Sequence, residues 1–232
     1  MMKIVGRIAA AVAVLGFLAA PASAQLHDNA VYPAMPGVGV TIAGDVALGL
    51  NDDAKVSGTA GLESPMFVGG RVTLGLPMFS VWAGAGMSPL GVEGADSDIT
   101  FGGGAGYHVL QGPMLPVTVS IQAGVGYQSF TGGSVMNVPF GVLLVVNVPS
   151  PIDVKPWIMP RGQLVRVSNG TSESEFGFGA SGGLMVTAPM GIGGHVTLDF
   201  LSLKPEGATE RFNPMRVSGG LHYKVAVPSL GM

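Results

Sequence analysis

Three histidines have the side chains best suited to catalysis or metal binding in this chain. His108, His195 and His222 each fall in a segment where polar and apolar residues alternate. A neutral imidazole binds zinc and a titrating one transfers protons, but both roles need partner side chains at a fitted distance. All three are expected at the same end of their segments, away from the acidic loops, so no loop supplies a carboxylate partner. We therefore predict no metal site and no cofactor.

Acidic and basic residues recur on the polar faces of these segments. This polar set comprises Asp45, Arg71, Arg161, Asp199, Arg216 and His222. An unpaired charge is costly away from water, so such side chains are expected to meet in ion pairs. We expect Asp45 to pair with Arg71, and Asp199 to meet Arg161 or Arg216. The alternative is that the same charges line a conducting path.

The segments that carry these residues have the period of β-strands. In residues 117–130, Val119 and Ile121 point to one face while the polar Gln122 points to the other. Ten segments show such alternation: 38–50, 66–76, 79–88, 99–110, 117–130, 135–148, 154–167, 175–188, 192–203 and 214–227. Residues 135–148 match least well, because they are apolar on both faces.

Composition favours a membrane over water as the surroundings of these strands. Charged residues make up 11% of the chain, whereas a soluble domain has about 25%. Beyond the first residues, no apolar run reaches the roughly 20 residues of a spanning helix. Lipid leaves only helices and closed barrels as spanning structures, since every backbone polar group needs an internal partner. We predict an all-β fold, a closed antiparallel transmembrane up-and-down β-barrel of about ten strands, with eight as the alternative.

The N-terminal residues predict export. Lys3 and Arg7 precede an apolar run, and Ala22-Ser-Ala24 has the small-x-small form of a signal-peptidase site. We predict a signal peptide at 1–24, an N-terminal periplasmic segment at 25–37, a barrel at 38–227 and a short tail at 228–232. The chain has no cysteine, so a closed hydrogen-bonded ladder rather than disulfides is expected to stabilise it.

The last strand-like run carries the most specific pattern. Ser218, Gly220, Tyr223 and Val225 occupy polar, glycine, aromatic and aliphatic positions in turn. This spacing resembles the C-terminal assembly signal of bacterial outer-membrane β-barrels, although that signal usually ends on a phenylalanine and this chain runs on to Met232. The mature chain is similar to the OmpA/OmpX-like or porin-like superfamily. The resemblance implies an integral location in the outer membrane and insertion by the barrel-assembly machinery.

The connections between the strands are of two alternating kinds. Those at 77–78, 111–116, 149–153 and 189–191 are short and contain proline, while the others are mostly longer and hold most of the acidic residues. Outer-membrane barrels have short periplasmic turns and long external loops, so the short connections are predicted to be periplasmic. Neighbouring carboxylates in the long loops are expected to bind divalent cations and, through them, lipopolysaccharide phosphates. They are Asp52, Asp53, Asp96 and Asp98.

The expected function is that of an integral outer-membrane barrel with a structural or surface-interaction role. Side chains just fill an eight-strand barrel and open pores need about 16 strands, so ten strands allow at most a narrow channel for ions or small solutes. The chain is predicted not to be an enzyme, because its outer rim has no histidine, and its net charge of -3 argues against nucleic acid. Two alternatives stay open: an outer-membrane enzyme acting at the rim on lipid or peptide, and a soluble periplasmic lipocalin-like binder with its apolar face inward.

Overall fold

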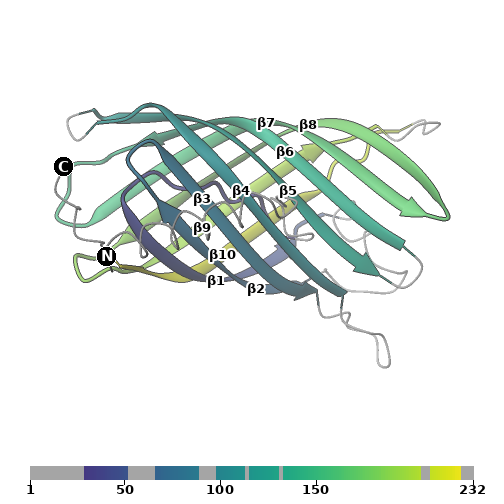
Figure 1. Cartoon of the computed structure of the whole chain (residues 1–232), viewed down its shortest axis with the longest axis horizontal. Helices are drawn as coiled ribbons and strands as arrows, with labels where there is room; N and C mark the ends of the chain where they lie inside the picture. The colour runs from purple at the N-terminus through teal and green to yellow at the C-terminus, as the bar shows by residue number, and fades with distance from the viewer. Residues whose placement is uncertain are drawn as a thin grey trace, which may run out of the picture.

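Ten antiparallel strands wrap into one closed barrel (Figure 1). The structure is a computed structural model that describes residues 29–51, 66–88, 98–112, 115–130, 133–204 and 210–225. The strands are β1 (Gly39–Gly49), β2 (Met66–Gly75), β3 (Phe79–Ser88), β4 (Asp98–Leu110), β5 (Val117–Phe130), β6 (Gly133–Val146), β7 (Asp153–Asn169), β8 (Thr171–Thr187), β9 (Ile192–Ser202) and β10 (Met215–Val225). Within these ranges no helix has the length and apolar character to cross a membrane. The predicted fold class is confirmed.

The first and last strands close the barrel. Their register runs without a shift from Val40 opposite Val225 to Gly49 opposite Arg216. Closure leaves no edge strand with unpaired backbone groups. The turns β2–β3, β4–β5, β6–β7 and β8–β9 lie at one end, which we call the short-turn end, and the other connections lie at the loop end.

The β7–β8 hairpin differs from the predicted boundaries. The sequence pattern indicates a loop at 168–174, whereas β7 continues to Asn169 and β8 begins at Thr171. Gly170 alone forms the turn with a φ of 73°, which glycine adopts without the strain that a Cβ would cause. The polar residues of this stretch reflect exposure rather than a loop, because β8 extends past β9, whose pairing with β8 begins only at Phe178 (Figure 1).

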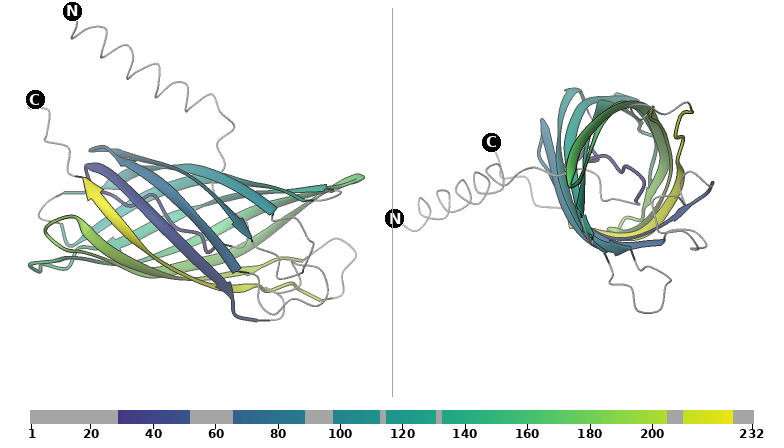
Figure 2. Two further views of the ribbon diagram at one scale, coloured as in Figure 1. Left: turned by 90° about the horizontal axis from the view of Figure 1, so that it is seen from below. Right: turned by 90° about the vertical axis from the view of Figure 1, so that its right-hand side faces the viewer.

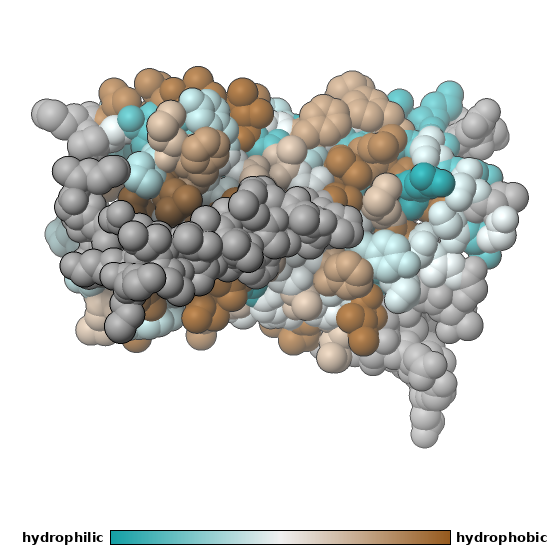
Figure 3. All heavy atoms as spheres, in the orientation of Figure 1, coloured by the Kyte–Doolittle hydropathy of each residue, from teal (hydrophilic) through white to brown (hydrophobic). Residues whose placement is uncertain are grey.

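The outward face of the barrel is apolar. Ile121, Leu198 and Leu221 have 57%, 57% and 74% of their surface exposed, and Figure 3 shows apolar side chains spread along the described wall. The inward face holds buried polar side chains such as Gln122 and Thr197. This arrangement suits a barrel surrounded by lipid. The lipocalin-like alternative is therefore wrong, because it needs the apolar face inside.

Outward aromatic rings gather near both ends of this wall. Near the loop end, the ring centroids of Phe101 and Tyr127 lie 5.2 Å apart. Near the short-turn end, those of Phe79 and Tyr107 are also 5.2 Å apart. Aromatic girdles of this kind mark the two membrane interfaces of outer-membrane barrels. The apolar wall between them is the part that suits the hydrocarbon layer.

Residues 29–37, which we call the lumenal segment, lie inside the barrel. Figure 2 shows this purple stretch within the ring of strands when the barrel is seen end-on. Val31 and Ala34 are 3% and 0% exposed. Gly37 and Gly39 have φ values of 134° and 132° and turn the chain from the lumen into β1.

This position corrects the prediction of a periplasmic segment at 25–37. Residues 25–28 lie outside the described ranges, but the remainder of that segment occupies the lumen. The error has a physical cause. An extended stretch without strand partners has no period in its sequence, so nothing local distinguishes a segment inside the barrel from one outside it.

Candidate functional site: the occupied lumen

The wall around the lumenal segment has two chemically different sides. On β3 and β5 several inward side chains are small and polar, as at Ser80, Thr118 and Ser120, all buried. Toward the short-turn end of β6 and β7, large apolar side chains point inward, as at Leu143 and Trp157, which are also buried. Because side chains are able to fill a narrow barrel, small residues on one side leave space that a peptide takes up.

The apolar side chains of the lumenal segment pack against the large residues of the wall. One buried cluster contains Val31, Tyr32, Met35, Leu143, Val145, Trp157, Met159 and Met185. Tyr32 meets Trp157 edge-on, with ring centroids 5.7 Å apart. This cluster explains why β6 is apolar on both faces: its inward side chains cover the lumenal segment, and its outward side chains are exposed on the barrel wall.

Polar side chains of the opposite wall bind the backbone of the lumenal segment. The Ala34 N–H donates to Oε1 of Gln122 over 2.9 Å, and Nε2 of Gln122 donates to the Ala34 carbonyl over 2.9 Å. The Ser80 hydroxyl donates to the same carbonyl over 2.9 Å. These bonds satisfy backbone groups that have no strand partner.

A buried charged group also contacts Tyr32. The guanidinium carbon of Arg71 lies 3.5 Å from the centroid of the Tyr32 ring, a cation–π contact. Nη2 of Arg71 is 3.0 Å from Oδ1 of Asp45, and Nε2 of His195 is 2.7 Å from the same oxygen. The lumenal segment thus covers an acid–base group that links β1, β2 and β9.

A second buried ion pair joins β7 to β9. Nη2 of Arg161 is 2.7 and 2.9 Å from the two carboxylate oxygens of Asp199. The Ser181 hydroxyl donates to Oδ1 of Asp199 over 2.5 Å and accepts from Nε of Arg161 over 3.3 Å. Arg216 stands opposite Asp199 in the ladder and is buried. These bonds offset the cost of burying the charges.

The other lumenal histidines contact hydroxyl groups. Nε2 of His222 lies 2.9 Å from Oγ1 of Thr187, so this member of the predicted polar network meets a neutral partner. Nδ1 of His108 lies 2.6 Å from Oγ of Ser120. Across the part of the chain that the structure describes, no three His, Cys, Asp or Glu side chains group as a metal site would require.

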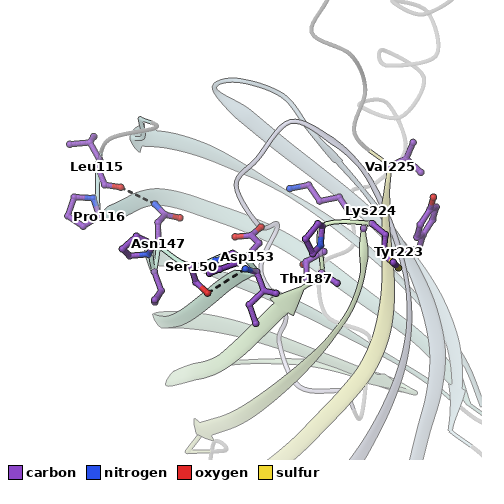
Figure 4. Close-up of a pocket in the computed structure, with 17 residues that line it drawn as sticks. Leu115, Pro116, Asn147, Ser150, Asp153, Thr187, Tyr223, Lys224 and Val225 are labelled. Atoms are coloured by element: carbon purple, nitrogen blue, oxygen red, sulfur yellow. Dashed lines mark hydrogen bonds between the residues drawn. The ribbon is translucent and has the colours of Figure 1, made fainter.

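Free space remains beside the lumenal segment. A cavity of about 30 Å³, room for about one water, adjoins Tyr32, Met35 and His195. A larger cavity of about 930 Å³ opens at the short-turn end, between the proline-containing turns and the end of β10 (Figure 4). The lumenal segment therefore occupies the middle of the lumen, while the short-turn end is open.

The acidic residues predicted at the loop end are only partly described. Asp52, Asp53 and Asp96 lie outside the described ranges, and Asp98 is the first residue of β4, opposite Ser88. The divalent-cation and lipopolysaccharide contacts predicted for them stay predictions.

The residues of the predicted assembly signal alternate along β10. Tyr223 and Val225 are exposed on the outer wall, whereas Ser218 is buried inside. Gly220 also faces inward, since a side chain there would meet the His195 ring and the Gly44 carbonyl. Recognition by the assembly machinery stays a prediction.

Comparison with known proteins returns barrels of the same kind. No protein-family model and no curated protein matches the sequence. The outer membrane protease OmpT from Escherichia coli is 7% identical, with a TM-score of 0.43 over 81% of this chain and 97% of that chain. The in-vitro folded OmpT of Vibrio cholerae, an outer membrane protein in trimer form, is 10% identical, with a TM-score of 0.33 over 70% of this chain and 57% of that chain. Ail, the attachment invasion locus protein of Yersinia pestis, is 9% identical, with a TM-score of 0.28 over 82% and 100%.

The wall is a closed barrel of ten strands, and its exterior is apolar. The chain has the fold of a small closed β-barrel with an exterior that suits lipid. The prediction that the chain is not an enzyme, made because its outer rim has no histidine, is withdrawn, because a protease is among the barrels whose fold matches it. At 7% identity the match concerns the fold and transfers no activity to this barrel.

Sequence reasoning missed the lumenal segment and with it the roles of Gln122 and Trp157. One signal was present. The inward positions of β6 are apolar at Leu143 and Val145, which a water-filled lumen does not explain. Such positions need an apolar partner, and that partner lies in residues 29–37.

Proposed function

We propose that this protein is a narrow outer-membrane channel for ions or small solutes and that the lumenal segment is its removable plug. The proposal rests on one observation: a stretch of backbone fills the middle of a barrel whose wall is complete without it. A barrel with a purely structural role gains nothing from leaving this space to a peptide. Larger side chains on β3 and β5 would fill it.

The contacts of the plug support its removal without unfolding of the barrel. Residues 29–37 contribute no strand to the closed ladder. The hydrogen bonds of Ala34 to Gln122 and Ser80 are each worth about 0.5–1.5 kcal/mol net. Burial of each apolar side chain adds about 1.5–3 kcal/mol. Release of the nine residues would recover about 1–2 kcal/mol of backbone conformational free energy per residue, which offsets most of this sum and leaves a local transition.

The path left by the plug would be narrow and polar along one side. Ser80, Ser120 and Gln122 line it from β3 and β5, and the Asp45–Arg71 pair lines it from β1 and β2. Hydroxyl, amide and paired charges of both signs replace part of the hydration shell of a passing solute. This lining favours ions and small polar solutes.

A disulfide lock tests the proposal. The chain has no cysteine, so the pair Ala34→Cys and Ser80→Cys would form the only disulfide. The Ser80 hydroxyl lies 2.9 Å from the Ala34 carbonyl oxygen, which places the two residues close together. Conductance of refolded protein in planar bilayers should be silent when the pair is oxidised and should appear after reduction.

A matched disulfide away from the lumen serves as the control. The hydroxyls of Ser168 and Ser172 lie 3.0 Å apart in the β7–β8 hairpin, so Ser168→Cys with Ser172→Cys makes a lock that leaves the plug free. This pair should conduct equally in both redox states. Conductance of the oxidised Ala34–Ser80 pair would exclude the plug. Silence in every state, with a folded barrel, would favour the structural or surface-interaction role.

A further inference from the structure

The opening at the short-turn end is built differently from the rest of the lumen. Its volume is about 930 Å³, and the β6–β7 and β8–β9 turns border it together with the end of β10 (Figure 4). Pro149, Pro151 and Pro189 lie in these turns. Proline has no N–H to donate, and the N–H groups of Asn147, Ala188 and Gly191 already bond to carbonyls, so side chains supply much of the remaining donor capacity at this opening.

Two lysines lie at or beside this opening: Lys224 lines it, and Lys155 stands next to its lining residue Asp153. Asp153 is the only acid that lines it among the described residues, and its carboxylate is 2.7 Å from Nζ of Lys155. Lys224 lines the opening from the β10 side, half-buried, and within the described ranges no carboxylate lies at ion-pair distance from its ammonium. An ammonium group taken partly out of water without a counter-charge favours binding of an anion.

The remaining groups at the opening combine polar and apolar character. Thr187 and Asn147 also line it; the Thr187 hydroxyl contacts His222, and the Asn147 amide nitrogen donates to Leu115 and Thr118. Met190 and Ile152 are 72% and 40% exposed beside it. Figure 4 shows Lys224 and Asp153 directed into the same space. An ammonium group beside a hydroxyl, an amide and exposed apolar side chains suits a small anion with a short apolar part.

We propose that the opening at the short-turn end is a binding site for small anions that carry a carboxylate or phosphate group. Lys224 is the principal ligand, and Lys155, held in place by Asp153, adds positive potential. Lys224 also lies beside Gly37, the end of the lumenal segment, so the site adjoins the plug without using its hydrogen bonds to Gln122 and Ser80. Anion binding to the closed barrel needs no conductance, so the two proposals are tested separately.

Titration calorimetry on the refolded barrel tests this site. Inorganic phosphate and butyrate are titrated separately at low ionic strength in a neutral detergent, which excludes lipid headgroups. Each should give a saturable signal. Lys224→Met should weaken binding about tenfold or more, as expected for the loss of one charge-assisted hydrogen bond, and Lys224→Arg should retain it. Heat-dependent gel migration shows that each variant is folded.

The exposed Lys204 at the loop end supplies the matched control. Lys204→Met removes the same charge and should bind both probes like the parent protein. Equal binding by Lys224→Met and the parent would place the anion elsewhere and overturn the proposal. So would a response that appears only after lipopolysaccharide is added to the detergent, because the ligand would then be a lipid headgroup rather than a free anion.

Discussion

Gln122 on β5 uses both polar atoms of its side-chain amide to hold the backbone of Ala34 in the lumenal segment. Oε1 accepts from the Ala34 N–H and Nε2 donates to the Ala34 carbonyl, each over 2.9 Å. The side chain thus reproduces one step of a β-ladder for a stretch that has no strand partner. Because these bonds cross from wall to plug, Gln122 is the position where the two are most directly coupled.

Gln122→Ala should loosen the lumenal segment without opening the barrel, since buried backbone groups lose partners at a cost of about 1–3 kcal/mol. The chain has two tryptophans, so in a Trp82→Phe background Trp157 alone reports the contact with the plug. Acrylamide quenching of its fluorescence should increase. Gln163→Ala, an inward amide bonded to Asn137 rather than to the plug, should leave quenching unchanged. Equal quenching in the two variants would contradict the coupling.

Gly75→Ala should displace the lumenal segment where it leaves the lumen. A Cβ on Gly75 would overlap the carbonyl of Gly37, whereas a Cβ on Gly182 would make only ordinary contacts. We expect single-channel conductance of Gly75→Ala to exceed that of the parent protein and of Gly182→Ala. A silent Gly75→Ala barrel that still shows heat-dependent migration would argue against a plug.

Asp199→Ala should destabilise the barrel strongly, because it leaves Arg161 buried without its counter-charge. The expected loss is about 3–5 kcal/mol in the free energy of unfolding, measured with urea in lipid vesicles. The double variant Arg161→Met with Asp199→Leu should recover much of this loss, since it removes both charges. If the losses of Arg161→Met and Asp199→Leu, each made alone, add up to the loss of the double variant, the pair is not coupled.

Val125→Arg should destabilise the membrane-inserted barrel by about 2–4 kcal/mol, because Val125 lies on the outward wall between the level of Tyr107 and the Phe101–Tyr127 pair. Ser174, on the same outward face as Phe176 and nearer the tip of the β7–β8 hairpin, supplies the depth control. Ser174→Arg should cost about 0–1 kcal/mol in the same assay. Equal losses at the two positions would mean that the membrane does not surround the wall between those rings.

Strand positions were predictable because alternation is a local property. Residues 117–130 alternate regularly and form β5 with the predicted bounds. The bounds of the β7–β8 hairpin were harder to predict, since serine and glutamate, as at Ser172 and Glu173, are common in both exposed strands and loops. Its tight turn depends on the positive φ of Gly170, which composition does not reveal.

The amino-acid sequence by itself determined the barrel, because side-chain period, low charge and the need to satisfy every backbone group in lipid leave one closed architecture. Only the tertiary structure decided what fills that barrel. The partners of the lumenal segment, Gln122 and Trp157, lie far from residues 29–37 in the chain, and an unpaired extended stretch carries no period of its own. Its place becomes visible once the closed wall brings a small-residue side and an apolar side together around it.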